Sequence, residues 1–226
     1  MAQVWHDLLF AHWPISPRIM RALVPEQLEL DLYGGDCWIG VVPFWMSGVR
    51  PRGLPPLPAF STFPELNLRT YVTVKDKPGV FFFSLDAASR LAVWGARTFY
   101  HLPYYLARMS TRWSGDWVQY DSQRVNTTAE LECRYRPDGP EFEAAPGTLE
   151  HFLTERYCLY TVSQGQVSRC DIHHAPWRLR TAQAAFTRNS VASTSGVELP
   201  NSPPHLLFSS LQEVMIWPLR KIEPAS

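Results

Sequence analysis

Short runs in which apolar and polar residues alternate recur along most of this 226-residue chain, separated by clusters of glycine, proline, aspartate and serine. Alternation with a period of two predicts strands, and many short strands joined by turns predict an antiparallel sandwich or barrel. Residues 178–185 fit either a strand or a short helix. The expected strands cover residues 8–15, 28–32, 37–49, 65–74, 79–86, 109–113, 117–125, 129–135, 141–143, 158–162, 167–173 and 205–220.

Two hairpins stand out in this pattern. Residues 28–32 and 37–49 flank a turn at residues 33–36, and residues 65–74 and 79–86 flank a charged turn at residues 75–78. In the second hairpin we expect Val74 opposite Gly79, Arg69 opposite Ser84 and Asn67 opposite Asp86, because that register matches polar positions with polar ones and a slip would mix the faces.

One face of the strand at residues 65–74 is polar throughout. Successive side chains on a strand point to opposite sides, so one side holds Glu65, Asn67, Arg69 and Tyr71. This side either faces solvent, where the pattern has no special meaning, or forms the wall of a cavity. Glu65 and Arg69 stand about 13 Å apart along the strand and cannot pair directly. Each therefore needs another partner, water or a ligand.

Three helices are expected. Asp86 is a suitable N-cap for a helix at residues 87–100 that Pro103 ends, Pro17 opens a short helix after Ser16, and Thr148 caps residues 149–157. Arg97 lies within the apolar helix sequence AVWGARTFY. We expect its guanidinium to meet a buried carboxylate or an anionic ligand, since a buried charge needs a partner.

Composition limits the class of protein. With 46% hydrophobic residues the chain can bury a sizeable core, and a single domain over residues 1–226 is the simplest organisation. The 21 basic residues balance the 21 acidic ones, which predicts no nucleic-acid partner and no anionic membrane surface. The chain has neither the start of a signal peptide nor an apolar run of about 20 residues, so we expect a cytoplasmic protein that does not enter a membrane.

Cysteine and histidine spacing indicates no metal and no cofactor. The four cysteines form no CxxC pair, so we expect reduced core thiols, with one disulfide as the alternative. His6 and His12 share a strand face without an acidic or cysteine partner at metal spacing, which favours structural histidines. The proline-rich run RPRGLPPLPAFSTFP is too apolar for a free linker. We expect it to pack over the barrel mouth or against a neighbouring subunit, which would make the protein a homo-oligomer.

Several sequence blocks in a fixed order carry a family resemblance: FAHWP at Phe10, RALVPEQLELD at Arg21, FPELNLRTYV at Phe63, GVFFFSLDA at Gly79, LPYYLARM at Leu102 and HHAPW at His173. Over nearly its whole length the chain resembles an uncharacterised bacterial domain-of-unknown-function family within the acetoacetate decarboxylase-like superfamily. The resemblance implies a mainly β (α+β) fold, an antiparallel β-barrel or cone with a few helices around a small-molecule pocket.

The resemblance also assigns positions. The superfamily's active-site glutamate falls on Glu65, its helix arginine on Arg97, its substrate-carboxylate arginine on His6 and a second acid near Gly40. Its catalytic Pro-Lys-Lys falls on Pro103-Tyr104-Tyr105. A Schiff base needs an amine, which tyrosine lacks, and the only lysines, Lys75, Lys77 and Lys221, lie in a turn and near the C-terminus. Decarboxylation through an imine is therefore not expected.

The resemblance implies that Glu65, Arg97 and Tyr104 converge in the pocket as catalytic residues. Glu65 would act as acid or base, Tyr104 would donate to an oxyanion, and Arg97 would hold a carboxylate or orient Glu65. The expected ligand-binding residues are His6, Asn67, Arg69, Tyr71 and Tyr105. Three functions stay open: a lyase, hydratase or isomerase acting on a small oxo acid or carbonyl compound, a noncatalytic sensor or carrier of a small molecule, and an interaction role for the proline-rich loop.

Overall fold

The computed structural model describes residues 1–51, 53, 55 and 61–222, so the central part of the proline-rich loop expected at residues 50–64, namely residues 52, 54 and 56–60, lies outside the described residues. Strands dominate it: β1 (Ala2–Ile15), β2 (Glu29–Leu30), β3 (Cys37–Arg50), β4 (Phe63–Val74), β5 (Lys77–Ala87), β6 (Tyr104–Ser114), β7 (Trp117–Arg124), β8 (Glu130–Phe142), β9 (Cys158–Ser163), β10 (Gln166–His173), β11 (Leu179–Asn189), β12 (His205–Ile216) and β13 (Arg220–Lys221). The helices are α1 (Pro17–Arg21), α2 (Arg90–Tyr100), α3 (Leu149–Thr154) and the 3-10 turn η1 (Ser193–Ser195).

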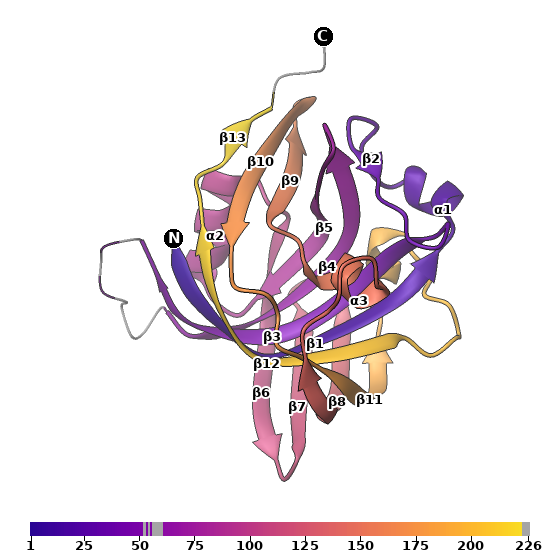
Figure 1. Ribbon diagram of the computed structural model, residues 1–226. Coiled ribbons are helices and arrows are strands. Elements are labelled where there is room, and N and C mark those ends of the chain that lie inside the picture. Colours follow the sequence, from indigo (N-terminus) through magenta and orange to yellow (C-terminus); the bar gives the residue numbers. More distant parts are fainter. Residues whose placement is uncertain (52, 54, 56–60, 223–226) are drawn as a thin grey trace.

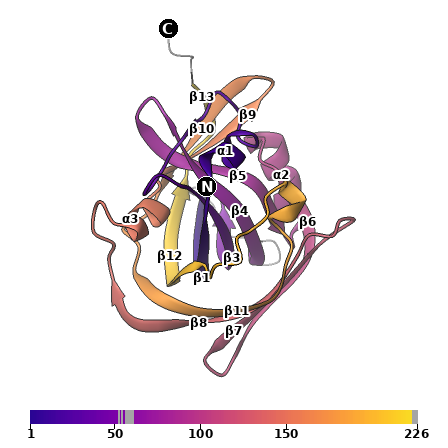
Figure 2. The ribbon, with the colours of Figure 1, turned by 90° about the vertical axis from the view of Figure 1, so that its right-hand side faces the viewer.

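The strands form one sheet that closes on itself. Its order is β13-β10-β9-β5-β6-β7-β8-β11-β12-β1-β3-β4-β2, and the further pairings of β4 with β5 and of β10 with β12 turn the open order into rings (Figure 1). Figure 2 shows β7, β8 and β11 curving around one end of the molecule, below the central strands. Where β5 meets β6 and β9 the pairs are parallel, whereas β5 meets β4 antiparallel. The predicted mainly-β barrel or cone with largely antiparallel strands is confirmed.

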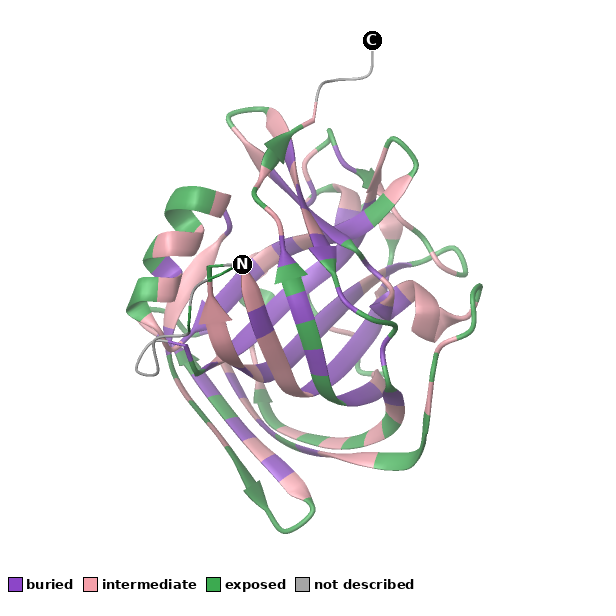
Figure 3. Ribbon diagram, turned by 60° about the vertical axis from the view of Figure 1, so that its left-hand side comes forward, coloured by how far each residue is buried: buried purple, intermediate pink, exposed green. Residues whose placement is uncertain are grey.

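Burial follows the alternation that predicted the strands. Along β7, buried side chains occupy every second position from Val118 to Arg124, and Figure 3 shows buried residues concentrated in the strands that cross the middle of the molecule. Apolar residues gather in three clusters. The third includes Val80, Phe82 and Leu85 of β5 and lies beside the polar face of β4. The four cysteines are buried thiols rather than disulfide partners, which confirms the first of the two expectations.

The hairpin of β4 and β5 forms as expected, but its predicted register is wrong. Val74 lies opposite Lys77, and Asn67 lies opposite Leu85 rather than Asp86. The cause is a β-bulge: between Leu68 and Arg69 the partner on β5 advances by two residues, which leaves Phe83 as an extra residue.

The bulge interrupts the period of two on β5. On one side of it Phe82 shares the face of Arg69, and on the other side Leu85 shares the face of Asn67. Ser84 and Asp86 consequently point to the opposite face, with Leu66 and Leu68 as neighbours. The polar side of β4 therefore meets apolar side chains of β5, not the polar ones that simple alternation assigned to it.

Helix ends and one hairpin also differ from expectation. α2 begins at Arg90, after Ser89, whose side chain accepts from the Ala92 N–H, so Asp86 is not its cap. Asp86 lies in β5 and pairs with Arg124 at 2.7 Å. Strand β2 pairs with β4 and not with β3, so the expected hairpin at residues 28–49 is wrong. The predicted cap at Thr148 is confirmed by its bond from the His151 N–H.

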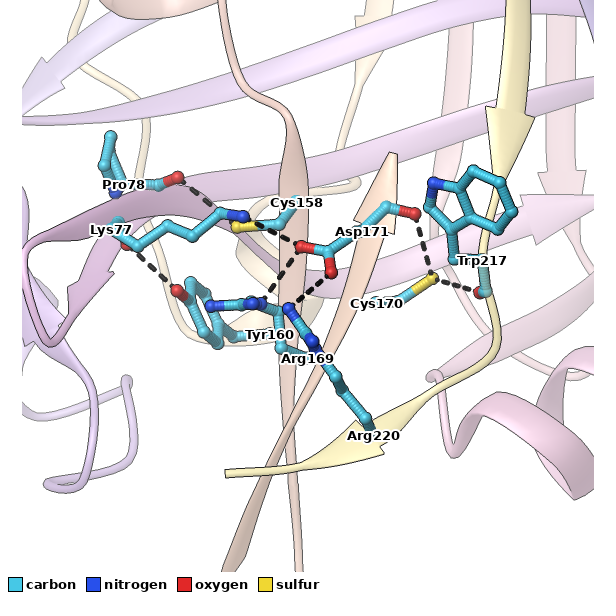
Figure 4. A network of polar contacts seen from close by, with 9 residues as sticks. All are labelled: Lys77, Pro78, Cys158, Tyr160, Arg169, Cys170, Asp171, Trp217 and Arg220. Carbon is cyan, nitrogen blue, oxygen red and sulfur yellow. Dashed lines mark hydrogen bonds and ion pairs between the residues drawn. The ribbon is translucent and has the colours of Figure 1, made fainter. Parts of the chain in front are cut away.

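A charged cluster ties the C-terminal strand to the sheet. Asp171 on β10 accepts contacts from Lys77 of β5 at 2.9 Å, from Arg169 at 3.0 Å and from Arg220 of β13 at 2.7 Å (Figure 4). Cys158 and Cys170 beside it donate to the backbone carbonyls of Pro78 and Trp217. One carboxylate therefore joins three segments that are far apart in the sequence.

Candidate functional site

A cavity of about 90 Å³ lies against the polar face of β4. A single water needs roughly 10–15 Å³ measured in this way, so the cavity has room for several waters or a small ligand. Its wall combines residues of β1, β4, β5, β6, α2, β9, β10 and β12 and of the segments around α3 and after β10. The lining residues are Met1, Gln3, Trp5, Glu65, Asn67, Arg69, Val80, Phe82, Leu85, Ala96, Tyr100, Leu102, Tyr104, Thr154, Arg156, Leu159, Ile172, His174, Trp177 and Ile216.

Three of the four polar residues predicted to share a face of β4 line this cavity. Glu65, Asn67 and Arg69 are only 4%, 6% and 8% exposed. The interpretation of this face as a cavity wall is therefore confirmed, and the solvent-facing alternative is wrong. Tyr71, the fourth, is fully buried behind the cavity, where its ring packs on Phe152.

Glu65 and Tyr104 form the chemically distinctive pair. The Tyr104 hydroxyl donates to Oε2 of Glu65 at 2.8 Å. They meet because β6 runs parallel to β5 with Tyr104 beside Leu85, and Leu85 in turn lies beside β4. Two of the three residues that the resemblance selected as catalytic are thus in direct contact.

The surroundings shift the proton equilibria of both groups. Burial raises the pKa of Glu65 to about 8, with the Tyr104 hydrogen bond opposing the rise and the charge of Asp86 adding to it. Burial and the neighbouring Glu65 carboxyl raise the pKa of Tyr104 well above its usual range. A carboxyl that titrates near neutral pH can both take and return a proton, as a general acid–base catalyst must. The phenol keeps its proton and can therefore donate a hydrogen bond to a ligand.

Arg69 anchors the other end of the polar face. Its Nη2 donates to the Leu153 carbonyl at 3.0 Å and to the Tyr71 hydroxyl at 3.3 Å. Tyr71 in turn lies 2.6 Å from Nε2 of His12, which is fully buried with a pKa lowered by that burial. His12 is thus the structural histidine that was expected, and it supports the wall behind Arg69.

Arg97 does not join the site, which corrects the expected convergence with Glu65 and Tyr104. It is exposed, its Nε donates to the backbone carbonyl of Tyr104 at 2.6 Å, and it is absent from the cavity wall. The reason is helical geometry: Ala96 and Tyr100, four residues apart on α2, face the cavity, and a residue next to Ala96 points about 100° away.

Two further predicted ligand-binding residues also lie outside the cavity, because each neighbours a strand residue that points into it. Tyr105 follows Tyr104, so its ring turns to the opposite face and packs on the Arg124 guanidinium at 4.1 Å. His6 follows Trp5, stacks on Trp45 at 3.9 Å and contacts the Ser47 hydroxyl at 2.7 Å. Of the predicted ligand-binding set, the structure brings only Asn67 and Arg69 to the cavity.

Sequence reasoning missed several polar wall residues, among them Trp5, Arg156 and Trp177. Arg156 pairs with Asp31 at 2.5 Å. The block HHAPW offered one usable signal: adjacent histidines point to opposite sides, and indeed His174 lines the cavity while His173 is exposed. No local pattern marks Trp5 or Arg156, because each comes to the cavity from a segment that is distant in sequence from β4.

The described residues offer little support for metal or amine chemistry at this site. In the residues that the structure describes, no group of three His, Cys, Asp or Glu side chains could hold a metal ion. Of the lysines, Lys77 is held by Asp171, and none of the three lies in the cavity wall. Over the same described ranges, no helix has the length and apolarity to cross a membrane.

Two sequence comparisons found proteins similar to this chain. The model of the family DUF2071, described as an uncharacterized conserved protein, matches residues 2–213. The uncharacterized protein YqjF of Bacillus subtilis is 50% identical over 222 residues, which cover 98% of this chain and 92% of that protein.

Solved structures with the same fold are much more distant in sequence. Acetoacetate decarboxylase from Legionella pneumophila superposes with a TM-score of 0.66 at 12% identity, over 99% of this chain and 88% of that one. The enduracididine biosynthesis enzyme MppR complexed with pyruvate superposes with a TM-score of 0.69 at 9% identity, over 100% of this chain and 91% of that one. At such identities the likeness shows the acetoacetate decarboxylase-like fold alone.

Proposed function

The chain belongs to the DUF2071 family, and from this membership and the geometry of the cavity we propose that it is an enzyme. Its reaction is an isomerase-, hydratase- or lyase-type conversion of a small oxo acid or related carbonyl compound. One observation carries the proposal: a buried carboxyl, whose pKa burial raises to about 8 and which accepts a hydrogen bond from a phenol, lines a cavity. Perturbed titratable groups in a cavity are typical of catalytic sites.

The pair suits proton transfer next to a carbonyl group. Ionised Glu65 takes a proton from the carbon adjacent to the carbonyl, and the electron pair of that C–H bond moves into an enolate. The Tyr104 hydroxyl, which now donates to Glu65, turns to the enolate oxygen and stabilises its charge. Protonated Glu65 then returns the proton to carbon, at the same or a neighbouring position. No amine takes part, in keeping with a cavity wall without lysine.

The fold neighbours support the choice of ligand class. MppR was obtained with pyruvate and with the condensation product of pyruvate and imidazole 4-carboxaldehyde, and acetoacetate decarboxylase acts, by its name, on an oxo acid. A cavity of about 90 Å³ in this chain suits ligands of that small size.

Deuterium exchange tests the proposal. The protein is incubated in D₂O with a panel of oxo acids and simple ketones, pyruvate and 5-oxohexanoate included, and loss of the hydrogens beside the carbonyl is followed by proton NMR. We expect Glu65→Gln to lower the exchange rate by at least about a hundredfold, the usual size of a general-base contribution. The exposed Glu26→Gln is the matched control and should exchange at the wild-type rate.

Two outcomes would count against the enzyme. Equal exchange by wild type and Glu65→Gln would remove Glu65 as the base. Binding of a panel member without any exchange would favour the second candidate, a noncatalytic sensor or carrier. That candidate is supported by the apolar part of the wall, where Val80, Phe82 and Leu85 lie on one strand and resemble the lining of small-molecule binding sites.

A further inference from the structure

Arg69 is a buried cation that lacks a counterion. The two other strongly buried guanidinium groups, of Arg124 and Arg156, each pair with a carboxylate. In the part of the chain covered by the structure, Arg69 forms no ion pair, although its residue is only 8% exposed. Its bonds go to a carbonyl and a hydroxyl, which carry no charge. Burial of an unpaired charge is costly, so this position is suited to an anion from outside the chain.

Hydrogen-bond donors in the same wall point to the same ligand. The Nε group of Arg69 and the indole N–H groups of Trp5 and Trp177 are buried, and none of them meets an acceptor among residues 1–51, 53, 55 and 61–222. All three groups can only donate. A carboxylate, which only accepts, complements them.

Arg69 and Trp177 contact the same Phe10 ring, whereas Trp5 packs on Phe44, the cross-strand partner of Glu65. The Phe10 ring packs on Trp177 at 5.0 Å and on the Arg69 guanidinium at 5.4 Å, and the rings of Trp5 and Trp177 stack at 6.0 Å. A carboxylate held by the Arg69 guanidinium would form charge-assisted hydrogen bonds, which are stronger than bonds between neutral groups.

The Arg69 guanidinium is remote from Glu65. The two residues are four apart on β4, about 13 Å along the strand, and the Arg69 guanidinium leans toward Tyr71 and Leu153, beyond Arg69 and away from Glu65. Between the two ends the wall presents the uncharged Asn67 and, opposite it on β5, the apolar Leu85. A ligand that reaches from one end to the other carries an uncharged chain between its two polar groups.

We infer that the cavity takes a monocarboxylate bound end-on, its carboxylate on Arg69 and Trp177 and its carbonyl group several carbons away beside Glu65 and Tyr104. The reacting end of this inference rests on the proposed function, whereas the carboxylate end does not. The substrate class is accordingly an oxo acid whose carbonyl is separated from the carboxylate, such as 5-oxohexanoate, and not a 2-oxo acid such as pyruvate. A dicarboxylate is rejected, because the second charge would meet Glu65 and the apolar wall.

Calorimetric affinities test the inference. The probes are 5-oxohexanoate, pyruvate and 2-hexanone, a ketone of the same length as the first without its carboxylate. We expect 5-oxohexanoate to bind wild type at least about tenfold more tightly than either other probe, and Arg69→Gln to remove this advantage. The exposed Arg18→Gln makes the same charge change and should leave all three affinities unchanged.

A second variant covers the case in which Arg69→Gln does not fold. Trp177→Phe keeps an aromatic ring and removes one donor, so we expect weaker binding of 5-oxohexanoate and an unchanged affinity for 2-hexanone.

The outcomes separate this inference from the proposed function. Unchanged 5-oxohexanoate affinity in Arg69→Gln or in Trp177→Phe, tighter binding of pyruvate, or no binding of any acid to wild type would overturn the inference. Deuterium exchange that depends on Glu65 could survive each of the first two results. Conversely, binding that depends on Arg69 without exchange would sink the proposed reaction and leave the carboxylate site intact.

Discussion

Replacement of Glu65 by glutamine should stabilise the protein, and the gain should depend on pH. Glu65 is buried in the cavity wall, and its pKa in the folded state is raised to about 8 from an ordinary value of 4.5. Glutamine has nearly the same shape, cannot ionise, and keeps a side-chain oxygen that can accept from the Tyr104 hydroxyl. The substitution therefore isolates the free-energy cost of ionising the buried Glu65 carboxyl.

The size of the effect follows from linkage. Between pH 4.5 and pH 8 the unfolded carboxyl has lost its proton and the folded one has kept it, so wild-type stability falls as pH rises through this interval. The free energy of unfolding changes by about 1.4 kcal/mol per pH unit in this interval. Between pH 4.5 and pH 8 the wild type therefore loses roughly 5 kcal/mol of stability. Below pH 4.5 the penalty is absent, and above pH 8 it is constant.

Urea denaturation at pH 5, 7 and 9 measures this difference. The free energy of unfolding of Glu65→Gln minus that of wild type should rise by several kcal/mol from pH 5 to pH 9, because only the wild-type side chain loses a proton. Glu26→Gln, at an exposed position, should show no such trend. A difference that is constant between pH 5 and pH 9 would mean that the carboxyl titrates normally, and the case for an acid–base catalyst would lose its basis.

Three further changes test other parts of the structure. Tyr104→Phe removes the hydrogen bond that opposes the raised carboxyl pKa, so the pH–rate profile of deuterium exchange should move to higher pH and its rate at pH 8 should fall; an unmoved profile would contradict the pairing. Gly40→Ala would place its Cβ 2.5 Å from Nε2 of His12, so the free energy of unfolding measured in urea should fall by about 1–3 kcal/mol. In the helix α2, the Cβ of Gly95→Ala meets nothing within 4 Å, so the free energy of unfolding should rise by about 0.5–1 kcal/mol. Asp171→Asn leaves three cations without their carboxylate, and since these groups are partly exposed the loss should be about 1 kcal/mol at low salt and less at high salt, as thermal unfolding can show.

Local rules predicted much of the fold. Alternation located most strands, because side-chain direction along a strand follows from backbone geometry alone. The cap at Thr148 was predicted correctly for a similar reason, since its bond spans three residues. Sequence blocks also selected Glu65 and Tyr104 as a pair, and the structure brings them into contact.

Other local rules failed where a single residue changed the geometry. The bulge at Phe83 moved Leu85 to the cavity side of β5 and turned Ser84 and Asp86 away from it, and no pattern in the sequence marks that insertion. Arg97 was expected in the site because its helix is apolar, but its neighbour Ala96 faces the cavity instead. A one-residue error on a helix or strand turns a side chain to another face.

The sequence by itself determined which side chains share a face, and therefore that Glu65, Asn67 and Arg69 point the same way. Only the tertiary structure decided that this face lines a cavity, that Trp177 and Arg69 contact the same Phe10 ring, and that no carboxylate pairs with Arg69 within the described chain. The reason is physical: the direction of a side chain depends on its own strand, whereas what covers it depends on strands that come together only when the sheet closes.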